Sequence, residues 1–253
     1  MDAVSARMNA LYSECRLLIE PESLSGAENM ARDEVLLAAA TLGGGPVLRM
    51  YTWQQPTLSL GYFQQREPWM EQPPWSETAM VRRLTGGGAI LHDREWTYSC
   101  VIPGKDFRLH HPYDLYDQIH QAIMGWTDER GITLKPRGVN RPQSAEPYLC
   151  YLRGDSHDLC LGDSKIVGSA QRRRKGALLQ HGSLLLQHSP LAPEIRGIHD
   201  LNPGVLFENQ MRSLGLRLAM VLGRDIRESA WTVAEWTAAE ELVAKKYSML
   251  DWR

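Results

Sequence analysis

The sequence has little of what marks a membrane, secreted or nucleic-acid-binding protein. Its longest apolar stretch near the start, Val35 to Leu42, is far too short to span a bilayer, and the first twenty residues have no signal-peptide core. The formal net charge is −2, so the chain lacks the basic excess that binds phosphate backbones. We therefore expect neither a membrane nor a nucleic acid among its partners.

Cysteine is scarce, and the common phosphate-binding motifs are missing. The four cysteines form no short-spaced pairs, which argues against a disulfide framework and against a Cys-x-x-Cys zinc site. No G-x-x-x-x-G-K-[ST] segment and no G-x-G-x-x-G after a strand occur, so neither a P-loop nor a dinucleotide-binding fold is supported. Reduced thiols in a cytoplasm are the expectation.

What is present is the pattern of an ordinary globular chain with a mixed fold. The 253 residues are 43% hydrophobic, enough for a sizeable core. A capping box of Ser25 and Glu28 predicts a helix that ends at Gly43 to Gly45, and a second one, of Thr232 and Glu235, predicts a helix to about Met249. Further helices are predicted around Leu115–Trp126 and over Phe207–Val221.

Short β-type segments separated by Pro, Gly and charged turns predict strands at 47–53, 57–64, 80–84, 89–92, 97–102, 158–161, 165–170 and 178–186. No repeat and no linker divides the chain. We therefore expect one α+β domain over residues 1–253, with a mixed, mainly antiparallel sheet flanked by helices.

The segment from Arg82 to Asp93 carries three consecutive glycines, Gly86 to Gly88. Glycines weaken a strand, so their presence indicates a need such as close approach of the backbone to a ligand. Arg82 and Arg83 beside exposed N–H groups are suited to hold a phosphate or carboxylate. Taken alone, however, the segment favours a plain glycine loop with two solvated arginines.

A second segment runs from Gly162 to Gly176 and continues to Ser183. Lys165 opens a strand whose small residues, Gly168 to Ala170, leave space for a flexible chain, although a lone strand lysine is usually a solvated edge residue. The basic run Arg172 to Lys175 predicts a solvated hairpin tip, with docking of an acidic partner as the functional alternative. If Gly162 and Asp163 form a two-residue turn, Cys160 lies directly opposite Lys165.

In this order and at this separation, the two segments resemble those of the lipoate-protein ligase and octanoyltransferase family, which is related to the biotin protein ligases. Residues 29–34, 59–64, 94–99 and 236–247 add to the resemblance, which covers nearly the whole chain. It implies the biotin/lipoate ligase catalytic-domain fold without the C-terminal accessory domain of many ligases. It also implies substrate binding by Arg83, Gly86, Gly87, Gly88, His92, Gly168, Ser169, Ala170, His181 and Gly182.

Two activities, those of ligases and of octanoyltransferases, occur in this family, and the resemblance includes features of each. Ligases use ATP to activate lipoate as an acyl-adenylate, whereas octanoyltransferases take the acyl group from acyl carrier protein through a cysteine thioester. Residues 165–171 and 180–183 are more similar to the transferases, in which Cys150 matches the nucleophile. Gly88 instead matches the ligases, because the transferases often carry Arg there. We expect a transferase that needs no cofactor; a ligase would need ATP and Mg.

The implied mechanism is ping-pong. Cys150 would attack octanoyl-acyl carrier protein, and a lysine of a lipoyl domain or of glycine-cleavage H protein would attack the acyl-enzyme. Lys165 is expected to stabilise the thiolate, and backbone N–H groups of Gly86 to Gly88 or Lys165 the oxyanion. His92 or His181 would orient groups or move a proton.

Several alternatives stay open. Hairpin geometry alone would nominate Cys160, not Cys150, as the nucleophile. A lipoyl amidotransferase would differ only in its acyl donor. A non-catalytic protein that binds acyl chains or lipoyl domains is the alternative from a different class, and intact Cys150 and Lys165 argue against it.

Overall fold

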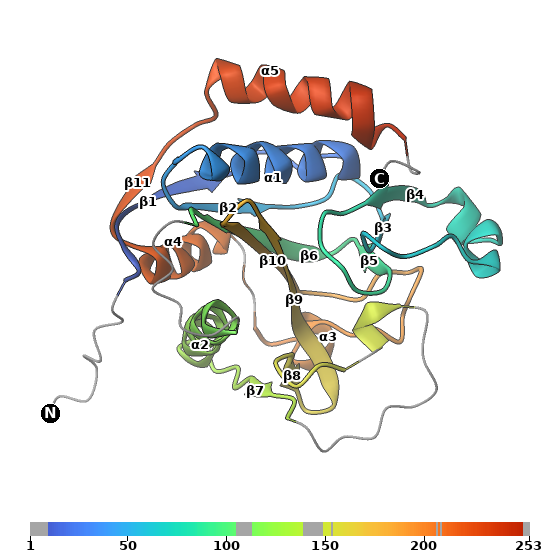
Figure 1. Ribbon diagram of the computed structural model, residues 1–253. Coiled ribbons are helices and arrows are strands. Elements are labelled where there is room, and N and C mark those ends of the chain that lie inside the picture. Colours follow the sequence, from blue (N-terminus) through green and yellow to red (C-terminus); the bar gives the residue numbers. More distant parts are fainter. Residues whose placement is uncertain are drawn as a thin grey trace, which may run out of the picture.

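The structure is a computed structural model that describes residues 10–104, 113–138, 149–152, 154–205, 207 and 209–249. Its main feature is an eight-stranded sheet with the order β11-β1-β2-β6-β10-β9-β8-β7, beside a three-stranded sheet with the order β4-β3-β5 (Figure 1). The strands of the large sheet are β1 (Tyr12–Ile19), β2 (Val47–Tyr51), β6 (Glu95–Ile102), β7 (Lys135–Pro136), β8 (Leu159–Leu161), β9 (Ser164–Arg174), β10 (Ala177–Leu185) and β11 (Gly223–Glu228). Those of the small sheet are β3 (Thr57–Leu60), β4 (Ala79–Arg82) and β5 (Ile90–His92).

Strand directions make the fold mixed and mainly antiparallel, as the sequence predicts. β1 runs parallel to both β2 and β11, whereas every pairing from β2 through β6, β10, β9 and β8 to β7 is antiparallel. In the small sheet β3 is parallel to β4 and antiparallel to β5. The expected α+β class is confirmed.

Helices cover both faces of the large sheet (Figure 1). Helix α1 (Gly26–Thr41) packs on one face with α5 (Val233–Leu242) above it, while α2 (Asp114–Asp128) and α4 (Met211–Leu222) pack on the other. A short helix, α3 (Ile198–Leu201), follows β10. None of the helices in the described ranges is long and apolar enough to cross a membrane.

Both predicted capping boxes are present, because the side chains of Ser25 and Thr232 accept the backbone N–H groups of Glu28 and Glu235. The apolar face predicted for α2 is buried in the core. Two helix bounds differ: α4 starts at Met211, and α5 ends at Leu242 and continues as a π-helical turn over Val243–Tyr247.

Strands β1 and β11, which were not predicted, form one edge of the large sheet. β11 reads Gly-Arg-Asp-Ile-Arg-Glu and is mostly exposed, so it has no apolar alternation to detect. It is held by backbone pairing to β1, from Tyr12 opposite Gly223 to Leu17 opposite Glu228. This edge of the sheet therefore depends on backbone pairing between segments far apart in the sequence, and the local sequence pattern does not reveal it.

The two sheets meet where the glycine segment between β4 and β5 approaches the middle of β9 and β10. An isolated parallel bridge joins Ala89 to Leu149, which ties the start of the 3₁₀ turn Cys150–Leu152 to the small sheet. In the large sheet, Gly182 on β10 lies opposite Ser169 on β9 and Tyr98 on β6. This junction positions the candidate site.

Candidate active site

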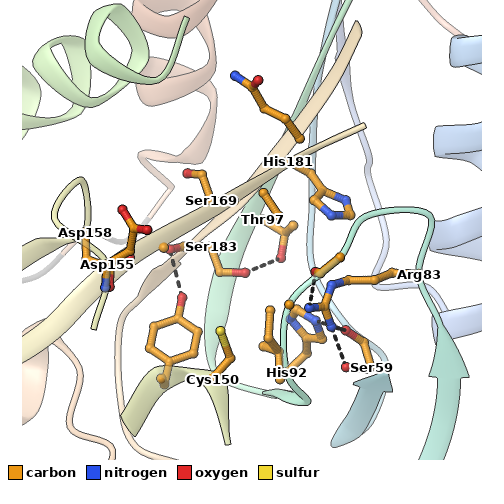
Figure 2. A pocket seen from close by; sticks show the side chains of 18 of the residues that line it. Ser59, Arg83, His92, Thr97, Cys150, Asp155, Asp158, Ser169, His181 and Ser183 are labelled. Carbon is orange, nitrogen blue, oxygen red and sulfur yellow. Dashed lines mark hydrogen bonds between the residues drawn. The ribbon is translucent and has the colours of Figure 1, made fainter. Parts of the chain in front are cut away.

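A cavity of about 340 Å³ lies at the junction of the two sheets (Figure 2). Of the twelve residues that the sequence assigns to catalysis or substrate binding, only Gly88 does not line it. Those that line it are Cys150, Lys165, Arg83, Gly86, Gly87, His92, Gly168, Ser169, Ala170, His181 and Gly182. Segments distant in the sequence therefore converge on one enclosed space.

Cys150 is the one cysteine that lines this cavity, and all four cysteines lie in the described ranges. Cys150 is partly exposed, and its backbone N–H donates to the carbonyl of Ala89 at 2.7 Å. Cys15 and Cys100 are buried in the core, and burial raises the pKa of the Cys15 thiol to about 12 and that of Cys100 well above its usual range. These two are inert as nucleophiles near neutral pH.

The hairpin geometry predicted for Cys160 is correct, but it does not bring Cys160 to the cavity. Gly162 and Asp163 form the two-residue turn, and Cys160 lies opposite Lys165 in the β8–β9 ladder. Cys160 is buried, however, and is absent from the cavity lining. The cavity thus favours Cys150 over Cys160.

Lys165 is held in a buried ion pair that the sequence analysis did not include. Its Nζ lies 3.0 Å from Oδ2 of Asp158 and 3.5 Å from the carbonyl oxygen of Cys150. The same Oδ2 accepts the backbone N–H of Asp155 at 2.7 Å. Burial raises the pKa of Asp158 above its usual range, against the lowering effect of the Lys165 charge. Lys165 thus contacts the main chain of Cys150 while its positive charge is paired with Asp158.

The small residues on β9 and β10 have a structural reason. A Cβ at Gly168 would lie 2.6 Å from Cε of Lys165, and a Cβ at Gly182 would lie 2.4 Å from Oγ of Ser169. The space expected for a flexible acyl chain at Gly168 is therefore taken in part by the protein's own lysine. Gly168 is needed to let Lys165 fold back along its own strand.

Arg83 braces the glycine segment and is not a solvated residue. It is 2% exposed, and its guanidinium donates to Ser59 O (2.7 Å), Ser59 Oγ (3.2 Å), Gly86 O (2.7 Å), Gly88 O (2.8 Å) and Thr85 Oγ1 (3.2 Å). These five bonds match the five N–H donors of a guanidinium. Gly88 thus accepts a hydrogen bond from Arg83 and does not line the cavity.

A second arginine fixes the loop that follows β3. Nη1 of Arg82 donates to the carbonyls of Gly61 and Gln64 at 2.9 and 2.7 Å. A Cβ at Gly61 would lie 1.9 Å from the carbonyl oxygen of Gly87, so only glycine permits this approach. Gly87 has φ +94°, a left-handed conformation that also favours glycine. The expectation of two solvated arginines, which the segment alone favoured, is wrong because both are buried.

His92 belongs to a buried polar group that we call the Glu95 cluster, made of Ser59, His92, Glu95, Thr97 and Ser183. His92 stacks on Trp53 at 3.9 Å, with Nδ1 2.7 Å from Glu95 Oε1 and Nε2 3.0 Å from Ser59 Oγ. Oε1 of Glu95 also accepts the hydroxyls of Thr97 (2.7 Å) and Ser183 (2.5 Å). Burial raises the pKa of Glu95, but His92 and these hydrogen bonds outweigh it and hold the pKa below its usual range.

His181 belongs to a different group, the Arg49 cluster, made of Glu20, Arg32, Asp33, Arg49 and His181 beneath α1. Nε2 of His181 lies 2.7 Å from Thr85 Oγ1, and Nδ1 lies 3.4 Å from Asp33 Oδ2. Burial lowers the pKa of His181, although Asp33 opposes the effect, so the ring is neutral near neutral pH. The sequence did not decide between the roles of His92 and His181. His181 is the one that contacts α1, through Asp33.

The wall toward α2 consists of residues that the sequence analysis missed. Oγ of Ser169 lies 2.8 Å from Nε2 of His120 and 2.6 Å from the hydroxyl of Tyr98, and its carbonyl accepts from Tyr116 at 3.1 Å. Burial is the main cause that lowers the pKa of His120 to about 4, so this histidine is neutral. The hydroxyl of Ser169 is therefore engaged by the protein.

One of the missed residues carried a usable signal. In a two-residue hairpin with Cys160 opposite Lys165, Asp158 falls diagonally across from the lysine on the same face, where opposite charges attract. For Tyr116 and His120 on α2 the sequence offers no such signal, because only the tertiary packing brings these two residues to β9. Within the described ranges, no group of three or more His, Cys, Asp or Glu residues is arranged to hold a metal ion.

The fold is similar to that of solved lipoate-protein ligases. A lipoate-protein ligase A crystal structure bound with ATP superposes with a TM-score of 0.74 at 25% identity, covering 94% of this chain and 98% of the other. A Thermoplasma acidophilum protein described as a putative lipoate protein ligase, with bound lipoic acid, gives a TM-score of 0.70 at 25% identity over 95% and 98% of the two chains.

The model of the "Lipoyl protein ligase A/B catalytic domain" matches residues 25–199, so the chain belongs to that family. Two curated relatives are named octanoyltransferase LipM. The Brevibacillus brevis protein is 30% identical over 92% of this chain and 96% of its own length, and the Staphylococcus aureus protein is 31% identical over 86% and 81%. The family and fold predicted from the sequence are confirmed.

Proposed function

We propose that the protein is an octanoyltransferase that moves an octanoyl group from acyl carrier protein, through a thioester on Cys150, to a lysine of a lipoyl domain. The observation that carries the proposal is that Cys150 is the cysteine facing a cavity built from both family segments. The curated relatives at 30% and 31% identity, which are named octanoyltransferases, support the same reaction. We assign the reaction to the cytoplasm, where acyl carrier protein and reduced thiols are both present.

The chemistry has two steps. The Cys150 thiolate attacks the thioester carbonyl carbon, the C–S bond to the carrier breaks, and the carrier thiolate leaves and takes up a proton. The ε-amine of the acceptor lysine then attacks the new thioester, loses a proton and releases the Cys150 thiolate. In each step the carbonyl oxygen becomes an oxyanion, for which backbone N–H groups of the glycine segment are suitable donors.

We assign the acceptor to a lipoyl domain or the related glycine-cleavage H protein. Its support is the family to which the chain belongs. A structural neighbour described as an archaeal bipartite lipoate protein ligase with its E2 lipoyl domain shares the fold. That neighbour is 24% identical and supports the fold alone, so the acceptor rests on the shared reaction class. The carrier-bound donor rests on the resemblance to octanoyltransferases.

An ATP-dependent lipoate ligase is the second candidate, and the ATP-bound structural neighbour favours it. In that reaction ATP with Mg would supply the chemistry of an acyl-adenylate, and backbone N–H groups of Gly86 and Gly87, which line the cavity, would be suitable donors to its phosphate. Arg83 fits this role poorly, because its five donors are already bonded to protein oxygens.

Intact-mass measurements separate these candidates. The wild type, Cys150→Ala and Cys160→Ala are incubated with octanoyl-acyl carrier protein and a lipoyl domain, without ATP. We expect octanoylation of enzyme and acceptor in the wild type and in Cys160→Ala, and a loss of at least about 1,000-fold in Cys150→Ala. Transfer that appears only with octanoate or lipoate plus ATP, and survives in Cys150→Ala, would establish the ligase.

A lipoyl amidotransferase is tested by replacing the carrier with an octanoylated lipoyl domain as donor. Tight binding of the carrier without any acyl-enzyme or adenylate would identify a non-catalytic binding protein.

A further inference from the structure

Two buried cations lie at the cavity, and their electrostatic surroundings differ. Lys165 is paired with Asp158 at 3.0 Å, and both side chains are at most 7% exposed. The pair as a unit carries no net charge. A thiolate nearby therefore interacts with a dipole, whose effect falls faster with distance than that of a single charge.

Arg83 has no such partner among the described residues. All five of its hydrogen bonds go to carbonyl or hydroxyl oxygens, and no carboxylate contacts it. Burial lowers the pKa of its guanidinium to about 10, and the charge of Cys150 is the one opposing cause. A buried unit charge stabilised only by neutral dipoles favours an anion nearby.

A short stretch of backbone links Cys150 to this cation. Nη2 of Arg83 donates to the carbonyl of Gly88, and the carbonyl of the next residue, Ala89, accepts the N–H of Cys150 at 2.7 Å. Both side chains line the same cavity (Figure 2). The brace that shapes the glycine segment thus also connects, through Ala89, to the main chain of Cys150.

We propose that the uncompensated guanidinium of Arg83, more than the ammonium of Lys165, stabilises the Cys150 thiolate, and that the Lys165–Asp158 pair positions the Cys150 main chain. This proposal deepens the proposed function and rests on it for its catalytic meaning. It replaces the sequence-based expectation that Lys165 activates the thiol by its charge.

The other ionisable groups that share the cavity with Cys150 do not supply a net positive charge. Lys165 is matched by Asp158, while His92 contacts the carboxylate of Glu95 and His157 that of Asp155. His120 is neutral, because burial lowers its pKa to about 4. His181 is kept neutral by burial, and burial raises the phenol pKa of both Tyr116 and Tyr151. Arg83 is the remaining cation among the described residues of the lining.

The test measures how the alkylation rate of Cys150 by iodoacetamide depends on pH, with the modified peptide identified by mass spectrometry and no acyl donor present. Four proteins are compared: the wild type, Arg83→Met, Arg83→Lys, and the double variant Lys165→Met with Asp158→Asn. The double variant removes the ion pair as a neutral unit, because Lys165→Met alone would leave a buried carboxylate near the thiol.

We expect Arg83→Met to move the midpoint of the alkylation profile to higher pH by about one unit or more. Arg83→Lys, which loses the same brace but keeps a charge, recovers at least half of that shift. The double variant keeps the wild-type midpoint within a few tenths of a unit while its octanoyl transfer slows. Circular dichroism confirms that each variant is folded.

A double variant whose midpoint rises as far as that of Arg83→Met overturns the inference. So does an Arg83→Met midpoint equal to that of the wild type. The double variant leaves the glycine segment intact, so its result decides even if Arg83→Met does not fold. Because alkylation needs no octanoyl donor, absent transfer with the expected midpoints overturns the proposed function alone.

Discussion

The Arg49 cluster and the Glu95 cluster are both buried and both reach the cavity, yet they are completed differently. In the Arg49 cluster, Arg49 contacts Glu20 at 2.6 Å and Asp33 at 2.9 Å, and Arg32 pairs with Glu20. In the Glu95 cluster, Oε2 of Glu95 is buried without a hydrogen-bond partner among the described residues. Closed networks rigidify a fold, so the Arg49 cluster is expected to contribute more to stability than the Glu95 cluster, in which the protein leaves one carboxylate oxygen without a partner.

The comparison predicts that the Arg49 cluster matters first for stability. Arg49→Met would leave two buried carboxylates without their shared cation, which costs about 3–5 kcal/mol of unfolding free energy. Urea denaturation measures this. The matched control is Arg212→Met, which removes an exposed pair with Glu228 on the surface and should not change the midpoint measurably. Equal effects of the two variants would break the comparison.

His92 and His181 allow a second test of the difference between the two clusters, because His92 belongs to the Glu95 cluster and His181 to the Arg49 cluster. We expect His92→Gln to reduce octanoyl transfer by about 100-fold, since Nδ1 of His92 lies 2.7 Å from the ionised Glu95, a closer contact than the 3.4 Å between His181 and Asp33. His181→Gln should lower the denaturation midpoint more than His92→Gln does, because it disturbs the contact with Asp33. Steady-state kinetics and urea titration of both variants give the two rankings. The reverse order in either would contradict the assignment.

Acid titration gives a smaller effect that both clusters share. The pKa values of Asp33 and Glu95 are lowered in the folded state, despite burial, by partners that include His181 and His92. The unfolded chain takes up protons at pH about 4, so this stabilisation is complete above that pH and is lost as pH falls further.

Each unit by which the folded pKa lies below the unfolded one contributes about 1.4 kcal/mol. We therefore expect Asp33→Asn and Glu95→Gln to be less stable than the wild type at pH 7, with the difference closing below pH 4. Asp33→Asn should show the larger loss, because its two oxygens are both engaged. Parallel urea titrations at pH 7 and pH 3.5 test this, and a constant difference would refute it.

Local patterns in the sequence predicted much of this fold. The Ser25–Glu28 capping box and the apolar face of α2 are local features, and both were recovered. The glycine and lysine segments were assigned through resemblance, and they do meet at one cavity. Single-domain organisation over residues 1–253 stays a prediction.

What the sequence could not show depends on partners far along the chain. That Arg83 is a buried brace follows from carbonyls on β3 and the glycine segment, which no spacing rule identifies. The α2 wall at Ser169 likewise depends on the packing of His120. Charge pairing across tertiary contacts, such as Asp33 with Arg49, is equally invisible in a linear pattern.

The parallel pairing of β1 with β11 has a consequence for how the chain is made. β1 lies near the amino end, but the strand that covers its outer edge is Gly223–Glu228, which leaves the ribosome some two hundred residues later. Until then, the outer edge of β1 exposes unpaired backbone groups, which invite pairing with other chains. Aggregation during synthesis should therefore depend on how fast the chain is made as far as Glu228.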